Sequence, residues 1–193
     1  SPYAVAPGRI LNGLQAPYQV FTPFLRAWRE HCWQAPFAQG EVEWILGIAS
    51  DDVPVQGETS AGELAALNRW QDFCEQDLDG YATQRDRPDL DGTSRLSAAL
   101  AFGEIHPRTM LADLSEIAGQ SRESGTPSLE DVDRFVAELG WREFYADVLW
   151  HHPDSVSNDL RDGFRGMRYD EELPEIDAWK AGKTGFPLVD AGM

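Results

Sequence analysis

The strongest hydrophobic periodicity in the sequence runs from about Leu129 to Trp150. Within it, apolar side chains recur at intervals of three or four residues, the spacing that gathers them on one face of a helix. These residues are Val132, Phe135, Val136, Leu139, Phe144 and Val148. The helix is expected to end at His151-His152-Pro153, because the residue before a proline disfavours helical geometry.

Weaker patterns of the same period predict further helices, and almost no alternating pattern typical of a strand is present. The predicted helices run from Thr22-Pro23 to about Trp33, from Ala61-Gly62-Glu63 to about Asp79, from Pro107 to about Ala118 and briefly from Pro174, with one more beginning in Phe186 to Met193. Trp33 to Gly62 and Asp154 to Leu173 are expected to be loops. The predicted fold class is all-α.

Residues 1–20 differ from the rest because they carry prolines and glycines and show no sustained periodicity. Such a segment is typical of a connector that enters a domain from an upstream part of a protein. Residues 21–193 are predicted to form one partial helical domain. We expect it to be truncated at its C-terminal side, since the last helical pattern stops in mid-turn.

The composition is that of a globular protein, because 193 residues with 42% hydrophobic content suffice to bury a core. No run of about 18 apolar residues occurs, so no membrane span is expected. No secretory signal is visible near Ser1. Cys32 and Cys74 have neither Cys-x-x-Cys spacing nor the pattern of a disulfide framework. We expect a cytoplasmic protein of bacterial type without a bound metal.

The formal net charge is −17, with 33 acidic and 16 basic residues. This balance argues against a nucleic-acid-binding surface spread over the whole chain, since such surfaces are usually basic. Charge at one groove matters more than the sum, however. A flavin-free helical interaction module with an acidic binding surface is therefore kept as one alternative.

Two clusters could carry chemistry. Hydroxyls and an arginine occupy Thr93 to Ser97, just before the apolar run 98–102, where they would either hold an anion or simply cap a helix. Glu138, Trp141 and Arg142 share one face of the long predicted helix at spacings of three and four residues. They could bind a flipped base and a phosphate, or form an ordinary Glu–Arg pair beside a core tryptophan. Gly140 within this helix favours close packing or close approach of a ligand.

Five ordered stretches of the chain resemble the DNA photolyase/cryptochrome family. They are Tyr81 to Pro88, Gly92 to Ser97, Phe102 to Arg108, Glu138 to Tyr145 and Ala178 to Met193. The likeness extends from near Pro17 to the last residue, and five matches in order are far more specific than one. The resemblance implies that the chain is the N-terminal half of a photolyase-type helical FAD-binding domain.

The resemblance further implies a U-shaped FAD beside a cavity that accepts a pyrimidine dimer flipped out of damaged DNA. Excited reduced flavin would pass one electron to the dimer, whose cyclobutane ring would split before the electron returned. The residues that would contact FAD are Tyr81, Thr93, Ser94, Arg95, Leu96, Ser97, Phe135 and Arg142. Those that would face DNA are Arg85, Glu138, Trp141, Arg142 and Tyr145, with Glu138 and Trp141 meeting the flipped bases.

Two departures from the family stand out. Tyr169 occupies the place of a surface tryptophan that ends the family's electron chain, ten residues before Trp179, and we predict that Tyr169 is the terminal donor. The sequence also lacks the family's upstream antenna domain, which would hold a folate or deazaflavin-type pigment, and the downstream half of the flavin domain. The chain alone is therefore expected to be inactive and to bind FAD weakly or not at all.

The activity implied for the longer protein is light-driven repair of cyclobutane pyrimidine dimers, a photo-lyase reaction performed by a monomer on damaged DNA. The main alternative is a cryptochrome-type blue-light photoreceptor, which keeps the flavin and lacks repair activity. Splitting of dimers in light distinguishes the two.

Overall fold

The structure is a computed structural model that describes residues 1–37, 40, 43, 45, 47, 61–167 and 174–193. The chain divides into two compact units, Ser1–His151 and His152–Met193. Throughout the described residues the regular structure is helical, apart from one isolated bridge between Leu11 and Pro17. The predicted all-α fold class is confirmed.

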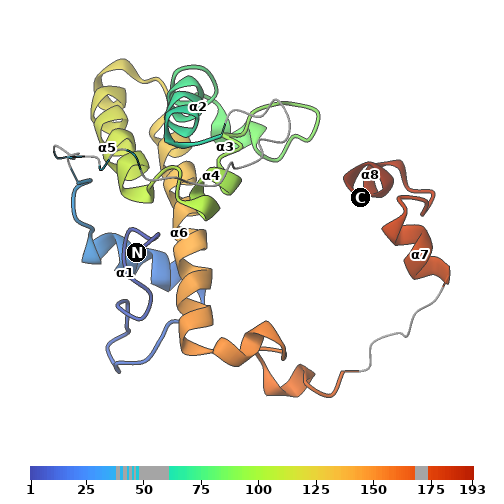
Figure 1. Ribbon diagram of the computed structural model, residues 1–193. Coiled ribbons are helices and arrows are strands. Elements are labelled where there is room, and N and C mark those ends of the chain that lie inside the picture. The colour runs from blue at the N-terminus through green and yellow to red at the C-terminus, as the bar shows by residue number, and fades with distance from the viewer. Residues whose placement is uncertain (38–39, 41–42, 44, 46, 48–60, 168–173) are drawn as a thin grey trace. The chain divides into compact units, whose positions relative to one another are not determined.

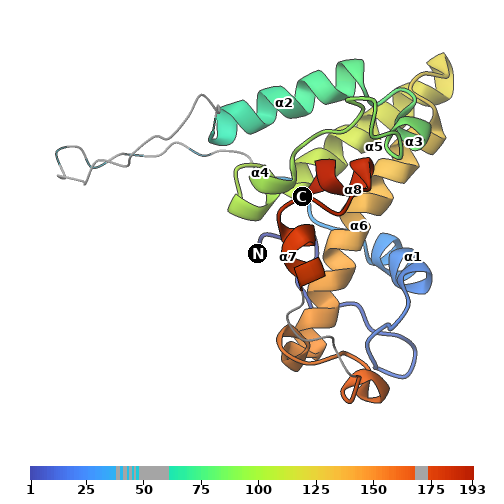
Figure 2. The same cartoon turned by 90° about the vertical axis from the view of Figure 1, so that its right-hand side faces the viewer.

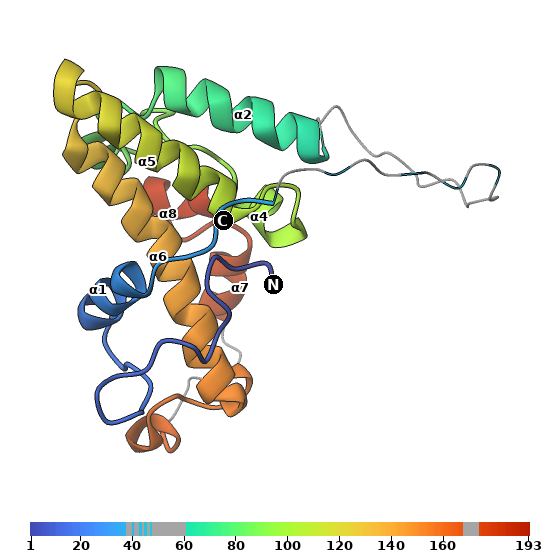
Figure 3. The ribbon, with the colours of Figure 1, turned by 90° about the vertical axis from the view of Figure 1, so that its left-hand side faces the viewer.

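The centre of the first unit is α6 (Leu129–His151), against which three helices pack directly: α1 (Phe21–His31), α3 (Tyr81–Gln84) and α5 (Pro107–Ser124). Figure 1 shows α5 lying along α6 and α1 packed lower on the same helix. The remaining two helices are α2 (Glu63–Gln76) and α4 (Ser97–Phe102). Figure 2 and Figure 3 show α2 beside α5, where the indole N–H of Trp70 donates to Asp113 at 2.8 Å.

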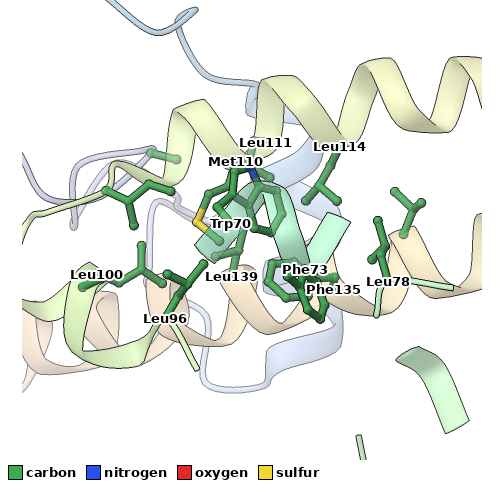
Figure 4. Packing of buried hydrophobic residues seen from close by; sticks show 14 of the residues in the cluster. Trp70, Phe73, Leu78, Leu96, Leu100, Met110, Leu111, Leu114, Phe135 and Leu139 are labelled. Carbon is green, nitrogen blue, oxygen red and sulfur yellow. The ribbon is translucent and has the colours of Figure 1, made fainter. Parts of the chain in front are cut away.

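The core of this unit is aromatic and aliphatic and draws on every helix. Figure 4 shows the side chains of α2, α5 and α6 converging, among them Trp70, Phe73, Met110, Leu114, Phe135 and Leu139. Each of these six side chains is at most 4% exposed. Burial of one such side chain stabilises the fold by about 1.5–3 kcal/mol relative to an exposed one, so this layer accounts for much of the unit's cohesion.

The first residues of α6 are held by a reciprocal cap. The Ser128 hydroxyl donates to Asp131 Oδ2 at 2.6 Å, and the Asp131 amide donates back to the Ser128 hydroxyl at 3.1 Å. Asp131 also accepts the backbone N–H of Ala82 at 2.8 Å, which joins α3 to the same point. Such a cap satisfies amides that a helix start leaves without partners, and it explains why the helix begins where the periodicity predicted.

The helix predicted to end near Ala118 continues to Ser124. Its last turns are polar, yet the Ser121 hydroxyl bonds the Ile117 carbonyl at 2.8 Å and the side chain is buried. Gly125 then ends the helix in the left-handed conformation, with φ 82°, a geometry that glycine adopts without a steric cost. Polar residues therefore extended the helix where we expected a break.

Residues near the N-terminus belong to the core of the first unit. Ala4, Val5 and Ile10 are each less than 9% exposed. The backbone N–H groups of Ala4 and Val5 donate to Glu143 at 2.8 and 3.0 Å. The absence of periodicity in residues 1–20 gave no sign of this packing, and the connector role of the segment stays a prediction.

The second unit contains two short 3-10 turns and two short helices: η1 (Pro153–Val156), η2 (Asp162–Phe164), α7 (Pro174–Lys180) and α8 (Pro187–Gly192). Asp190 organises the turn before α8, because it accepts the Thr184 hydroxyl at 2.6 Å and the Thr184 and Gly185 amides at 2.8 and 3.1 Å. The helices predicted from Pro174 and within Phe186 to Met193 are therefore present. None of the helices in the described ranges has both the length and the apolarity to cross a bilayer.

Candidate functional site

A cavity of about 600 Å³ opens where α3, the segment before α4, and α6 meet. Its lining residues are Tyr81, Thr93, Ser94, Arg95, Leu96, Ser97, Leu100, Phe135, Glu138, Leu139 and Arg142. All eight residues that were predicted to contact FAD lie in this set. Figure 4 shows Leu96, Leu100 and Leu139 side by side, so the same residues serve as cavity wall and core.

The polar side of the cavity is formed by Thr93 to Ser97. Within the described residues, the hydroxyls of Thr93, Ser94 and Ser97 make no side-chain hydrogen bond to the protein, which leaves them available to a ligand. Arg95 adopts a left-handed backbone conformation, with φ 52°, and its guanidinium pairs with Asp91 at 2.8 Å. Hydroxyls and a guanidinium together suit the oxygens of a phosphate.

The opposite wall is aromatic. Phe135 packs against Tyr81 with ring centroids 5.2 Å apart and against Phe73 at 5.0 Å. Burial raises the pKa of the Tyr81 phenol above its ordinary value of 10, so the ring stays neutral near neutral pH. A cavity with one hydroxyl-rich side and one flat apolar side suits a ligand that combines phosphates with an aromatic ring system.

Glu138, at the cavity edge, is paired with Arg85. The Arg85 guanidinium also lies 5.7 Å from the centre of the Tyr81 ring. Its hydrogen bond to Glu138 is the largest of the contributions that raise the pKa of Arg85. The structure thus brings together the residue expected to face the DNA backbone and the residue expected to meet a flipped base.

Arg142 lines the cavity, but its donors serve the fold. Its guanidinium donates to the carbonyls of Pro2 at 2.9 Å and Leu100 at 3.2 Å, and it lies 4.5 Å from the centre of the Tyr3 ring. One side chain therefore ties the N-terminal segment to α4 and α6. What it offers a ligand is a fixed positive charge in the cavity wall.

Trp141 and Tyr145 are not among the residues lining the cavity. The Trp141 ring stacks on Phe21, with centroids 3.6 Å apart and planes inclined by 10°, and on Tyr145 at 5.5 Å. Tyr145 is 62% exposed. Gly140, beside Trp141, faces α1: a Cβ there would lie 2.6 Å from Leu25 Cδ1. The sequence left two explanations for Gly140, close packing and close approach of a ligand, and the structure supports close packing.

Tyr169 lies outside the described residues. Trp179, the landmark used to identify it, is on α7 in the second unit and is 49% exposed. Among the described residues, no group of three or more histidine, cysteine or acidic side chains is arranged to hold a metal ion.

Three buried carboxylates on α6, Asp131, Glu143 and Asp147, were not expected from the sequence, and the last two hold the N-terminal segment. Glu143 is 3% exposed and Asp147 is 2% exposed. They bind the backbone N–H groups of Ala4, Val5 and Gly8. Their spacing of four residues places both on one helix face, a signal that could have identified them as a pair.

Comparison with known proteins bears on this arrangement directly. Residues 135–193 match the FAD binding domain of DNA photolyase. The deoxyribodipyrimidine photo-lyase of Salmonella typhimurium is 34% identical over 204 residues, which cover 98% of this chain and 42% of that protein. The crystal structure of a bacterial class III photolyase from Agrobacterium tumefaciens aligns with a TM-score of 0.78 and 29% identity, over 99% of this chain and 42% of the other.

Over nearly its whole length the chain is similar to photolyases. A cryptochrome from Synechocystis shares the fold, with a TM-score of 0.72 at 21% identity, over 100% of this chain and 43% of that one. The chain spans about two fifths of the length of the curated relatives it matches. The cavity between α3, α4 and α6 therefore lies in a part of a photolyase-type FAD-binding domain.

Proposed function

We propose that the complete protein containing this chain uses light and FAD to split cyclobutane pyrimidine dimers in damaged DNA. The observation that supports this function best is the composition of the cavity. Eight residues from separate parts of the sequence, each expected to contact FAD, surround one space together with Glu138. The chain would thus contribute one wall of the flavin site and part of the surface that receives DNA.

The fit to FAD follows from the two sides of the cavity. Thr93, Ser94, Ser97 and Arg95 would hold the diphosphate, because hydroxyl and guanidinium donors match its oxygens. Tyr81 and Phe135 would border the ring system. When bound, the flavin supplies the light-driven electron transfer to the dimer.

The DNA-facing roles fall to residues at and beyond the cavity edge. Glu138 would accept hydrogen bonds from the bases of a flipped dimer, and Trp141 would stack on them. Arg85 would then exchange its pairing with Glu138 for the DNA backbone. We propose that the protein acts as a monomer, and the local charge at this edge, rather than the net charge of −17, would govern the encounter.

The test is repair by the complete protein, purified with reduced flavin and mixed with an oligonucleotide that contains one cyclobutane thymine dimer. Blue or near-ultraviolet light should restore the two thymines, as measured by chromatography, and darkness should not. Glu138→Gln should lower repair by about five- to 150-fold, since one bidentate base contact is worth about 1–3 kcal/mol. Glu130→Gln is the matched control, because Glu130 lies in the first turn of the same helix, is exposed and does not line the cavity.

Two further outcomes separate the alternatives. Stoichiometric flavin with no dimer splitting in light would contradict repair and favour a photoreceptor. A complete protein without flavin would contradict the whole proposal and favour an interaction module.

A further inference from the structure

An aromatic stack lies on α1 and α6, among residues that do not line the cavity. Phe21, the first residue of α1, lies almost parallel to Trp141, with ring centroids 3.6 Å apart and an interplanar angle of 10°. Phe144 meets the same indole edge-on, with centroids 5.8 Å apart and planes at 74°. Trp141 is half-buried, with Phe21 against the face of the indole and the exposed Tyr145 ring stacked on it at 5.5 Å and 22°.

Gly140 lies where α1 and α6 approach each other. A Cβ at position 140 would come within 2.6 Å of Leu25 Cδ1 and 3.7 Å of Phe21 Cε2. Phe21 and Leu25 are four residues apart and so lie on the same face of α1. Glycine is unfavourable in a helix interior, yet here a larger residue would require the tip of the Leu25 side chain to move.

We infer that Phe21 is a positioning residue for Trp141. The inference rests on the proposed function, in which Trp141 stacks on a flipped pyrimidine dimer. A half-exposed indole would otherwise sample several side-chain rotamers and would lose that freedom on binding. By stacking on one face, Phe21 holds the indole plane before the DNA arrives, which is the form of support that an accurate binding site needs.

Helices α1 and α6 are also joined two turns away from the aromatic stack. Arg29, near the C-terminal end of α1, pairs with Asp133 Oδ1 at 2.7 Å. Phe21 and Arg29 thus bind positions 141 and 133 respectively, so α1 runs antiparallel to α6 and touches it over two turns of each helix. This double attachment limits the tilt of α1, and with it the movement of the Phe21 ring.

The experiment uses the complete protein with bound flavin and measures affinity for a dimer-containing duplex, affinity for the undamaged duplex, flavin content and melting temperature. Phe21→Leu should weaken dimer binding about three- to tenfold, because freezing one free side chain costs an equilibrium factor of that order. Affinity for undamaged DNA and flavin content should not change. Phe21→Tyr, which keeps the ring, should restore dimer affinity.

A double-mutant cycle separates positioning from general stability. In a Trp141→Ala background, Phe21→Leu should have no further effect on dimer affinity, because the residue it positions is gone. Phe102→Leu is the matched control, since Phe102 is an aromatic residue that is 84% exposed and does not line the cavity. It should leave dimer affinity unchanged.

Each outcome is informative. If Trp141→Ala weakens dimer binding and Phe21→Leu does not, the inference is wrong while the proposed function stands. If Trp141→Ala itself has no effect, the proposed role of Trp141 fails. Should Phe21→Leu lower flavin content or fail to fold, Phe21→Met provides the second variant: it keeps a long apolar side chain without the ring, so unchanged dimer affinity there would overturn the inference.

Discussion

Helix α6 carries two glutamates, Glu138 and Glu143, whose surroundings are opposite in kind. The Glu143 side chain is 2% exposed and accepts three hydrogen bonds, from the amides of Ala4 and Val5 and from the Trp28 indole. The Glu138 side chain is 32% exposed, lines the cavity and pairs with the side chain of Arg85. The two are five residues apart, which places them on different faces of the helix.

Glu143 and Glu138 differ in the kind of group that donates hydrogen bonds to them. Backbone amides fixed by the fold cannot be replaced by a ligand, so Glu143 is committed to holding the N-terminal segment. A guanidinium on a flexible side chain can leave, so Glu138 remains able to bind something else. The same residue type on one helix thus serves the fold at one position and is available for chemistry at the other.

The largest expected effect comes from removing each carboxylate in turn. Glu143→Leu should destabilise the chain by about 3–5 kcal/mol, because three buried N–H groups lose their acceptor and each costs about 1–3 kcal/mol. Glu138→Leu, the matched control, should cost less than about 1 kcal/mol, since its ion pair is partly exposed. Urea unfolding measures both. Equal losses in the two variants would contradict the comparison.

A smaller effect is expected from pH, and it contrasts Glu143 with Asp131. Burial raises the pKa of Glu143 above its ordinary value of 4.5, against the hydrogen bonds it accepts. Burial also acts on Asp131, but hydrogen bonds from Ser128, Ala82 and Gly80 hold its pKa below the ordinary value of 3.8. Burial thus outweighs the hydrogen bonds at Glu143, whereas the hydrogen bonds outweigh burial at Asp131.

The signs of the two contributions follow by linkage. The Glu143 contribution is fully present below pH 4.5 and is lost as the pH rises through the folded-state pKa, because the folded protein holds that proton more tightly. The Asp131 contribution is present above pH 3.8 and is lost as the pH falls through its lower folded-state pKa. The free energy of unfolding is measured from pH 3 to 7. Its fall with rising pH should disappear in Glu143→Gln, and its fall with decreasing pH should disappear in Asp131→Asn. A slope that persists in its variant would show that another group causes it.

The smallest expected effect concerns the Arg85–Glu138 pair itself. Arg85→Met should change stability by less than about 1 kcal/mol at low salt, and the difference from wild type should shrink in 1 M NaCl, where charges are screened beyond about 3 Å. The loss in Glu143→Leu should not depend on salt, because its hydrogen bonds are buried. Both variants are compared with wild type at the same salt concentration, since screening a net charge of −17 will itself stabilise the chain. A salt-independent loss in Arg85→Met would mean that this pair, too, is structural.

How far the sequence predicted the site depends on how local each interaction is. The hydroxyl run Thr93 to Ser97 and the face that carries Glu138 and Arg142 could be located from spacing, and the family resemblance placed them around one ligand. The pairing of Arg85 with Glu138 could not be predicted, because it joins helices 53 positions apart in the sequence. The separation of Trp141 from the cavity was equally invisible, since three residues on one helix need not face the same space.

The sequence by itself determined the longest helix of this protein, since periodicity and capping are local: α6 was expected from about Leu129 to Trp150 and runs from Leu129 to His151. Only the tertiary structure decided what the polar residues of that helix do. Glu143 finds its donors at Ala4 and Val5, and Asp147 at Gly8, nearly 140 positions upstream. Whether a carboxylate serves the fold or the site is set by partners that the chain brings together only when it folds.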